Sequence, residues 1–205
     1  MGFAQIVEPG DAERAEVEAF IRTAYAREYS ANINSFAKRL LCRRNTAGDI
    51  LCAAGMRLAE EGFFSERYLS APVEADLSRV TGHRVRRADI YEVTTLASDA
   101  PRDLVPFIAD IVAFGGRRGL SWCFFTLTHR LSLLVRRRGL SPIHLAEADP
   151  ARIADREEWG RYYETRPQVY GVCGVDMLAA YRRAKATAFC APSASSRAMD
   201  HAAVI

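Results

Sequence analysis

Residues 88–97 read ADIYEVTTLA and residues 104–118 read LVPFIADIVAFGGRR; they are followed by SWCFFT at 121–126, HRLSLLVRRR at 129–138 and IHLA at 143–146. The short runs are apolar, aromatic and β-branched, which is typical of strands. The two longer runs carry apolar residues at helical spacing, and a glycine follows each of them directly. Strands that alternate with helices predict βαβ units and a largely parallel segment of sheet.

The sequence before this stretch predicts an antiparallel part of the same sheet. Strands are expected at 3–8, 40–44 and 50–58, the last two joined by the turn NTAGD, and helices at about 11–25, 32–38 and 74–80. After residue 149 we expect short helices around Trp159 and Tyr163 and an extended piece at 169–175. The fold class is therefore α/β, with one mixed central sheet flanked by helices. We expect a single domain at 1–183 and a disordered tail at 184–205, where small and polar residues dominate.

Composition excludes several classes of protein. The chain has 205 residues, of which 49% are hydrophobic and 26% charged, and its net charge of +3 is too small to argue for nucleic acid. The N-terminus does not resemble a signal peptide, and no apolar run reaches the roughly 20 residues of a membrane span. The five cysteines form no Cys-x-x-Cys pair, so neither a disulfide framework nor a metal site is expected. We expect a cytoplasmic protein without a transmembrane segment.

Several pieces, in order between about residues 63 and 174, resemble the thermostable hemolysin family. They read ERYL at 66–69, IYEV at 90–93, GLSWCFFTLT at 119–128, HLAEAD at 144–149 and WGRYYE at 159–164. The last piece is the most distinctive. The family name records a lytic phenotype, whereas the order of elements is similar to that of GNAT acyltransferases and acyl-homoserine-lactone synthases. This resemblance implies a GNAT-like domain and, as a hypothesis, acyl-transfer chemistry.

Two features depart from the GNAT pattern. The resemblance implies that the strand at 88–97 faces an acyl thioester and that the next helix N-terminus receives the pyrophosphate of coenzyme A. The usual glycine-rich loop is replaced by Ser98-Asp99-Ala100-Pro101-Arg102, in which Asp99 repels a phosphate and Arg102 attracts one. The tyrosine that often protonates the leaving thiolate is replaced by Val135, four residues before Gly139. Acyl groups on a carrier protein therefore fit better than free acyl-CoA.

Glu92 and Tyr163 are the candidate catalytic residues. A carboxylate in the central strand is suited to deprotonating an attacking amine; the structural alternative is an ion pair with Arg57 or Arg87. We expect a phenol, from Tyr163 or alternatively Tyr162, to replace the missing proton donor.

Candidate substrate-binding residues carry hydroxyl, aromatic or charged groups near the same strand: Arg67, Tyr68, Thr94, Thr95, Thr126, Thr128, Trp159, Tyr162 and Glu164. For the threonines the structural alternative is strand formation, and for Trp159, Tyr162 and Glu164 it is an aromatic cover over the sheet. Candidate acyl-donor residues are Leu96, Arg102, Arg130 and Arg137. Arginines near helix ends also complement the helix dipole, which is the alternative explanation for the last two.

Three hypotheses from different classes follow. The first is an acyltransferase-like enzyme that moves an acyl group from a thioester, on acyl carrier protein or as acyl-CoA, to a small amine. The second is a membrane-acting cytolysin. The third is a non-catalytic binding protein that keeps the fold. The sequence leaves the acyl chain, the acceptor and the oligomeric state open.

Overall fold

The computed structural model describes residues 3–137, 140–176 and 203–204. Its strands and helices are β1 (Phe3–Val7), α1 (Arg14–Tyr29), β2 (Arg39–Arg44), β3 (Ile50–Leu58), α2 (Val73–Thr81), β4 (Ile90–Ser98), α3 (Pro101–Arg117), β5 (Trp122–Leu127), α4 (His129–Arg137), β6 (Ile143–Glu147), β7 (Gln168–Cys173) and β8 (Ala203–Val204). Short 3₁₀ helices include η2 (Ser65–Tyr68), η3 (Arg87–Asp89), η5 (Arg156–Trp159) and η6 (Tyr162–Thr165).

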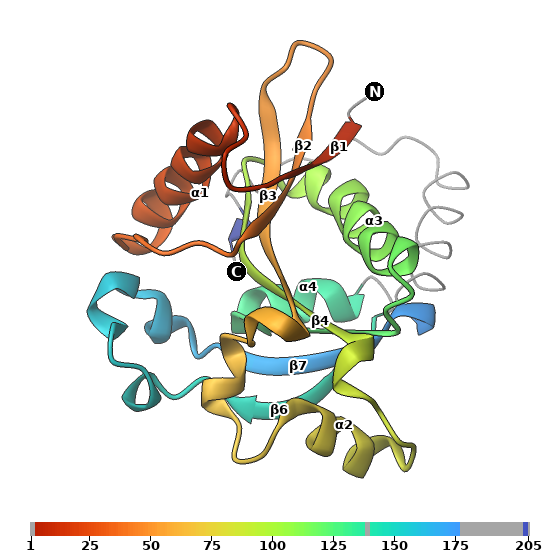
Figure 1. The fold of residues 1–205 in the computed structure, drawn as a ribbon. Coiled ribbons are helices and arrows are strands. Elements are labelled where there is room, and N and C mark those ends of the chain that lie inside the picture. Colours follow the sequence, from red (N-terminus) through yellow and green to blue (C-terminus); the bar gives the residue numbers. More distant parts are fainter. Residues whose placement is uncertain (1–2, 138–139, 177–202, 205) are drawn as a thin grey trace.

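One mixed sheet organises the molecule. Its strand order is β1-β2-β3-β4-β5-β7-β6, with β8 pairing on β4. The pair β4–β5 is parallel and the other pairs are antiparallel. Strong twist turns β6 and β7 across the direction of β1–β4 (Figure 1). The predicted fold class, a mixed sheet flanked by helices, is confirmed.

The prediction of a largely parallel segment is wrong. β5 and β6 are not neighbours, because β7 lies between them and pairs antiparallel with both. The physical reason lies in burial. Four consecutive residues of β7, 169–172, are buried, whereas β6 has no fully buried residue. A strand that is apolar on both faces belongs inside the sheet, and a half-exposed strand belongs at its edge.

The helix expected at 32–38 is also absent, and this segment has no regular secondary structure. Its apolar residues Ala31 and Ile33 are buried while Asn32 between them is exposed. Side chains of α1 satisfy its carbonyl groups: Arg14 donates to the carbonyl oxygens of residues 37 and 38, and Arg22 to that of Ile33. These long-range bonds replace the hydrogen bonds that a helix would have made.

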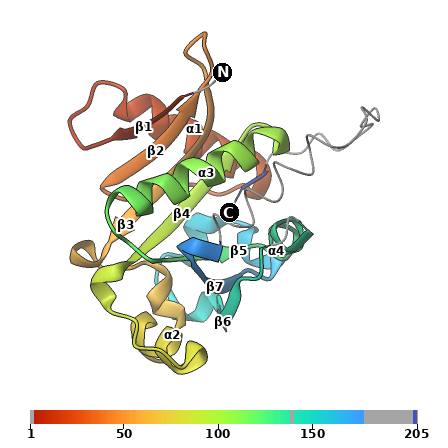
Figure 2. The same ribbon diagram turned by 90° about the vertical axis from the view of Figure 1, so that its right-hand side faces the viewer.

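Helices cover both faces of the sheet. Figure 1 shows α1 and α3 on opposite sides of β1–β4, and Figure 2 shows α3 lying along that half of the sheet. On one face, apolar residues of α3 and α4 pack on β4, β5 and β7. On the other face, α1 covers the first half of the sheet, while η2 and α2 cover the second half. Trp159 and Tyr163 pack against both of these clusters, so the segment η5–η6 bridges them.

The parallel pair β4–β5 is short and then splays apart. Its register runs from Ile90↔Trp122 to Val93↔Phe125 and stops there, although β4 continues to Ser98. β3 pairs with Ala97 and Ser98 along one edge of β4, so β8, which also pairs with these two residues, lies along the edge that β5 leaves. The gap between β4 and β5 is the feature on which the site is built.

The predicted domain boundary between residues 183 and 184 lies outside the described residues. Of the tail predicted at 184–205, the structure describes only Ala203 and Val204, as β8.

Candidate functional site

A β-bulge lies in β4 where the strand leaves β5. The register with β3 shifts between Ala53↔Ala97 and Gly55↔Thr94, which places one extra residue in β4. Thr95 in this bulge has a φ of 45°, in the left-handed region that β-branched residues avoid. Gly55 leaves room for the bulge, because a Cβ there would lie 2.3 Å from the Oγ1 of Thr94. A regular strand points successive side chains to opposite faces, whereas here Thr94 and Thr95 reach the same pocket.

That pocket, called the polar pocket here because hydroxyl groups lie among its aromatic rings, is on the face covered by η2, η5 and η6. Hydroxyl groups and aromatic rings form its walls, from Phe64, Ser65, Tyr68, Val93, Thr94, Thr95, Thr126, Trp159 and Tyr162. Ser65 and Thr126 hydrogen-bond to each other through their hydroxyls at 2.9 Å. The structure therefore brings together six of the nine predicted substrate-binding residues.

Glu92 lies behind the wall of this pocket. It is fully buried, and its carboxylate oxygens accept hydrogen bonds from the backbone N–H groups of Phe64 (2.6 Å) and Ser65 (2.7 Å). Burial raises the pKa of Glu92, and hydrogen bonds from Ser65, including one from its side chain, partly oppose that rise. Glu92 thus holds the η2 wall in place and contacts the pocket through the Ser65 hydroxyl.

Of the arginines expected to pair with Glu92, Arg57 lies directly opposite it in the β3–β4 register. The charge of Arg57 lowers the pKa of Glu92, although by less than burial raises it. Arg87 instead binds Glu66 and Glu74, with nitrogen–oxygen distances of 2.6 and 3.0 Å.

Aromatic side chains of η5 and η6 cover the polar pocket, where the sequence predicted an aromatic cluster. The phenol oxygens of Tyr68 and Tyr163 are 2.6 Å apart, and burial raises the pKa of Tyr68 to about 12 and that of Tyr163 further still. Trp159 lies against Phe64 and Tyr162, with ring centroids 5.4 Å away in both cases. The phenols are therefore protonated at neutral pH, and the cluster serves both as a cover and as a pocket wall.

An apolar pocket lies on the opposite face of β4, between α3 and α4. Every residue that lines it is apolar: Val93, Leu96, Leu104, Ile108, Ile111, Cys123, Phe125, Leu127, Leu131, Val135, Leu140, Pro142 and Val172. Val93, the last residue of β4 that pairs with β5, lines this pocket and the polar pocket alike, so the two pockets lie on opposite faces of the point where the strands separate. Leu96, predicted to bind the acyl donor, lines this pocket, and so does Val135.

Three predicted substrate-binding residues lie outside the polar pocket. Arg67 is half-exposed, and its guanidinium lies over the ring of Phe64 and 3.9 Å from Asp155. Thr128 is buried, and its hydroxyl accepts a hydrogen bond from the N–H of Leu131 at the start of α4. Glu164 is exposed on η6. For Thr128 this geometry is that of a helix cap.

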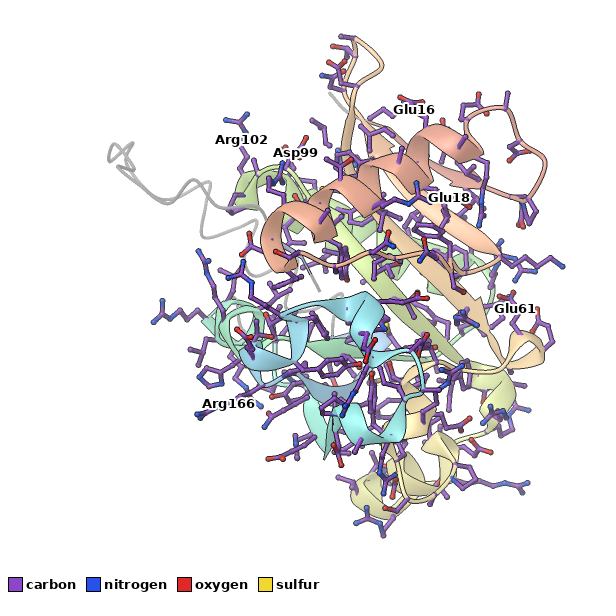
Figure 3. All side chains as sticks on the ribbon, turned by 90° about the vertical axis from the view of Figure 1, so that its left-hand side faces the viewer. Glu16, Glu18, Glu61, Asp99, Arg102 and Arg166 are labelled. Carbon is purple, nitrogen blue, oxygen red and sulfur yellow. The ribbon has the colours of Figure 1, made fainter. Side chains whose placement is uncertain are left out.

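The predicted donor-binding arginines are at the surface. Arg102 extends outward at the start of α3, beside Asp99 (Figure 3), which lies 3.5 Å from Arg27. Arg130 and Arg137 are exposed at the two ends of α4. None of the three lines either pocket.

Sequence reasoning missed Phe64 and Ser65 in the polar pocket and almost the whole apolar pocket. The residues of the apolar pocket were recognised only as core faces of α3 and α4. The spacing of these apolar residues is the same whether or not the core contains a cavity, so the sequence did not indicate a pocket. Gly55, the one glycine inside β3, was a usable signal, because glycine in a strand often marks a bulge.

Comparison with known proteins shows the family of this chain. The sequence model of the thermostable hemolysin family matches residues 7–177. The chain belongs to that family. No curated protein matches it. The resemblance seen in the sequence is thereby confirmed over a longer part of the chain than the motifs covered.

Members of two groups of synthases share the fold. An N-acyl amino acid synthase from uncultured soil microbes, FeeM, is 14% identical with a TM-score of 0.59, over 90% of this chain and 99% of that one. BjaI, a coenzyme A-dependent acyl-homoserine lactone synthase solved with S-adenosylmethionine (SAM) and isopentyl-CoA, is 10% identical with a TM-score of 0.56, over 90% of each chain. The acyl-homoserine-lactone synthase LasI is 9% identical with a TM-score of 0.55, over 85% and 90%. At these identities the likeness concerns the fold.

Two further observations concern the described residues. None of their helices combines the length and the apolar character that crossing a membrane requires. Within the same ranges, no three His, Cys, Asp or Glu side chains gather as a metal site would need.

Proposed function

We propose that this member of the thermostable hemolysin family transfers an acyl group from a thioester to a small amine. One observation carries the proposal. A polar pocket and a wholly apolar pocket lie on either side of β4 and share Val93, at the point where β4 splays from β5. An acyl chain suits the apolar pocket, an amine suits the hydroxyl-lined pocket, and the thioester carbonyl then lies between them. The shared fold of the acyl-transferring synthases supports the same assignment.

In this proposal the amine nitrogen attacks the thioester carbon, a C–N bond forms and the C–S bond breaks. The proton that the amine loses passes through the Ser65 and Thr126 hydroxyls to Glu92, which is a stronger base than an exposed carboxylate because burial raises its pKa. The thiolate takes a proton from Tyr68, which Tyr163 holds in place. Proton exchange with solvent then returns Glu92 and Tyr68 to their starting protonation states.

The donor that we propose is an acyl group on a carrier protein, with acyl-CoA as the alternative. Exposed arginines support this choice, since Arg130, Arg136 and Arg137 of α4 offer an acidic carrier a positive surface. The lack of a glycine-rich phosphate loop before α3 supports it as well. A cytoplasmic location belongs to the same proposal and is supported by the free thiols of Cys42, Cys52, Cys123 and Cys173.

The test measures thiol release from acetyl, octanoyl and dodecanoyl donors, each on coenzyme A and on carrier protein, with amino acids and SAM as acceptors. We expect consumption of the longer donors. Val135→Phe fills the apolar pocket, and we expect it to lower the rate with dodecanoyl relative to acetyl donors by at least about tenfold. Leu133→Phe is the matched control on α4, because Leu133 is 44% exposed.

Other outcomes separate the remaining hypotheses. Donor-induced stabilisation without thiol release indicates a non-catalytic binding protein. Dye release from liposomes by the purified protein, without any thioester, indicates a cytolysin. Loss of the chain-length preference in Leu133→Phe as well as in Val135→Phe contradicts the assignment of the apolar pocket.

A further inference from the structure

Thr95, which lines the polar pocket, has two unfavourable features: a strained backbone and a buried hydroxyl without a hydrogen-bond partner. Its φ of 45° is unfavourable for a β-branched side chain. Its hydroxyl is buried, with the whole side chain only 7% exposed, and its Oγ1 is among the few buried side-chain atoms of the described residues without a hydrogen-bond partner. Structures rarely keep either feature unless the site uses it.

The bulge explains where this hydroxyl lies. In a regular strand one of the residues Thr94 and Thr95 would face the apolar pocket, but the extra residue in β4 brings both into the polar pocket. Both Oγ1 atoms crowd the space above Gly55, at 2.3 and 3.2 Å from where a Cβ would be. Thr94 and Thr95 directly follow Val93, the residue that both pockets share. A carbonyl that spans the two pockets therefore passes beside the unpaired hydroxyl.

We propose that the hydroxyl of Thr95 donates a hydrogen bond to the thioester carbonyl oxygen and stabilises the negative charge that builds on it as the amine attacks. The inference rests on the proposed function and deepens it by naming the residue that stabilises the oxyanion. Thr95 forms no covalent bond to the substrate. A donor without a partner in the free protein suits this role, because no existing hydrogen bond has to break before the charge develops.

The test compares Thr95→Val with Thr95→Ser. Valine keeps the shape and the β-branching but has no hydroxyl, whereas serine keeps the hydroxyl. With a donor that the wild type consumes, we expect Thr95→Val to lower kcat by about 10- to 100-fold while KM changes less than about twofold. Thr95→Ser keeps kcat within about threefold of the wild type. An unchanged kcat in Thr95→Val, or an equal loss in both variants, overturns the inference.

A second readout needs no turnover. Removing an unpaired buried hydroxyl should leave the Tm of Thr95→Val equal to or above that of the wild type. A lower Tm in Thr95→Val shows that the hydroxyl serves the fold and contradicts the inference.

Binding gives a third readout. A ketone analogue of the donor, which keeps the carbonyl, should stabilise the wild type more than a thioether analogue without it, and Thr95→Val should abolish that difference. If the wild type is active but both analogues stabilise it equally, the inference about Thr95 is wrong while the proposed function stands. If the wild type neither consumes nor binds any donor, the proposed function is wrong, and so is the inference that rests on it.

Discussion

At the scale of single residues, a network around Glu66 holds the η2 wall of the polar pocket. Both oxygens of Glu66 accept hydrogen bonds from the guanidinium of Arg87, at 2.6 and 2.8 Å, and one also accepts from the N–H of Val73. The guanidinium lies over the ring of Phe63. The network thus ties η2 to α2 and η3, and the geometry of Ser65 and Tyr68 depends on it.

Replacing Glu66 by Gln should lower the free energy of unfolding by about 1–2 kcal/mol near neutral pH, since a charge-assisted, partly buried pair is lost. The hydrogen bonds from Arg87 lower the pKa of Glu66 in the folded state. The stabilisation is therefore complete above the unfolded pKa, near about 4.3, and disappears as the pH falls through the folded pKa. Denaturant unfolding at several pH values measures this dependence.

Glu74→Gln is the matched control for this prediction. Glu74 makes one hydrogen bond to the same guanidinium, at 3.0 Å, so we expect a smaller loss. A difference between the wild type and Glu66→Gln that stays constant into the acid range would contradict the ionic account.

At the scale of elements, the segment η5–η6 is fixed to the end of α1 by its backbone. The N–H of Arg161 donates to the carbonyl of Tyr29, and the N–H of Asn32 donates to the carbonyl of Glu158. Gly160 lies between these bonds with a φ of 51°, and a Cβ there would be 2.3 Å from the carbonyl oxygen of Tyr29. The aromatic cover of the pocket therefore depends on a close approach that only glycine permits.

We expect Gly160→Ala to destabilise the protein by about 2–4 kcal/mol, because the clash is with backbone atoms and the conformation is strained for alanine. Gly116→Ala is the matched control: Gly116 is helical, and nothing lies within 4 Å of its added Cβ. There the free energy of unfolding should stay the same or rise by up to about 1 kcal/mol. Chemical denaturation of both variants checks the pair, and equal stabilities would refute this account of the contact.

At the scale of the whole molecule, the splay between β4 and β5 brings together parts of the chain that are far apart in sequence. β5 does not pair with β4 at Ala97 and Ser98, and β8 (Ala203–Val204) pairs with this edge instead, beside α1. We expect the arm of the thioester donor to lie along this edge of β4, where β8 competes with it for the same backbone groups.

Deleting residues 203–205 should therefore tighten donor binding, by roughly two- to tenfold, because a tethered competitor is removed. Val204→Pro, which keeps the chain length but disfavours strand pairing, should act in the same direction. Thermal-shift titration with the donor analogues gives the affinities. Unchanged or weaker donor binding in both variants would show that β8 does not compete.

The sequence by itself determined the elements and the family. The strand predicted at 50–58 has those bounds in the structure, and α3, α4 and β5 differ from their predicted ranges by a few residues at most. Apolar periodicity and glycine positions influence secondary structure over a few residues, so helices and strands can be predicted from a short stretch of sequence. The motifs of residues 63–174 likewise sufficed for the family.

Only the tertiary structure decided the strand order and the site. β7 enters between β5 and β6 because of its burial on both faces, and Arg14 and Arg22 of α1 bind carbonyl groups of the non-helical segment before β2. The partner of Arg87 is Glu66 and not Glu92, and the bulge at Thr95 depends on Gly55 of another strand. Each of these outcomes arises from contacts between residues distant in sequence, whose energies no local pattern records.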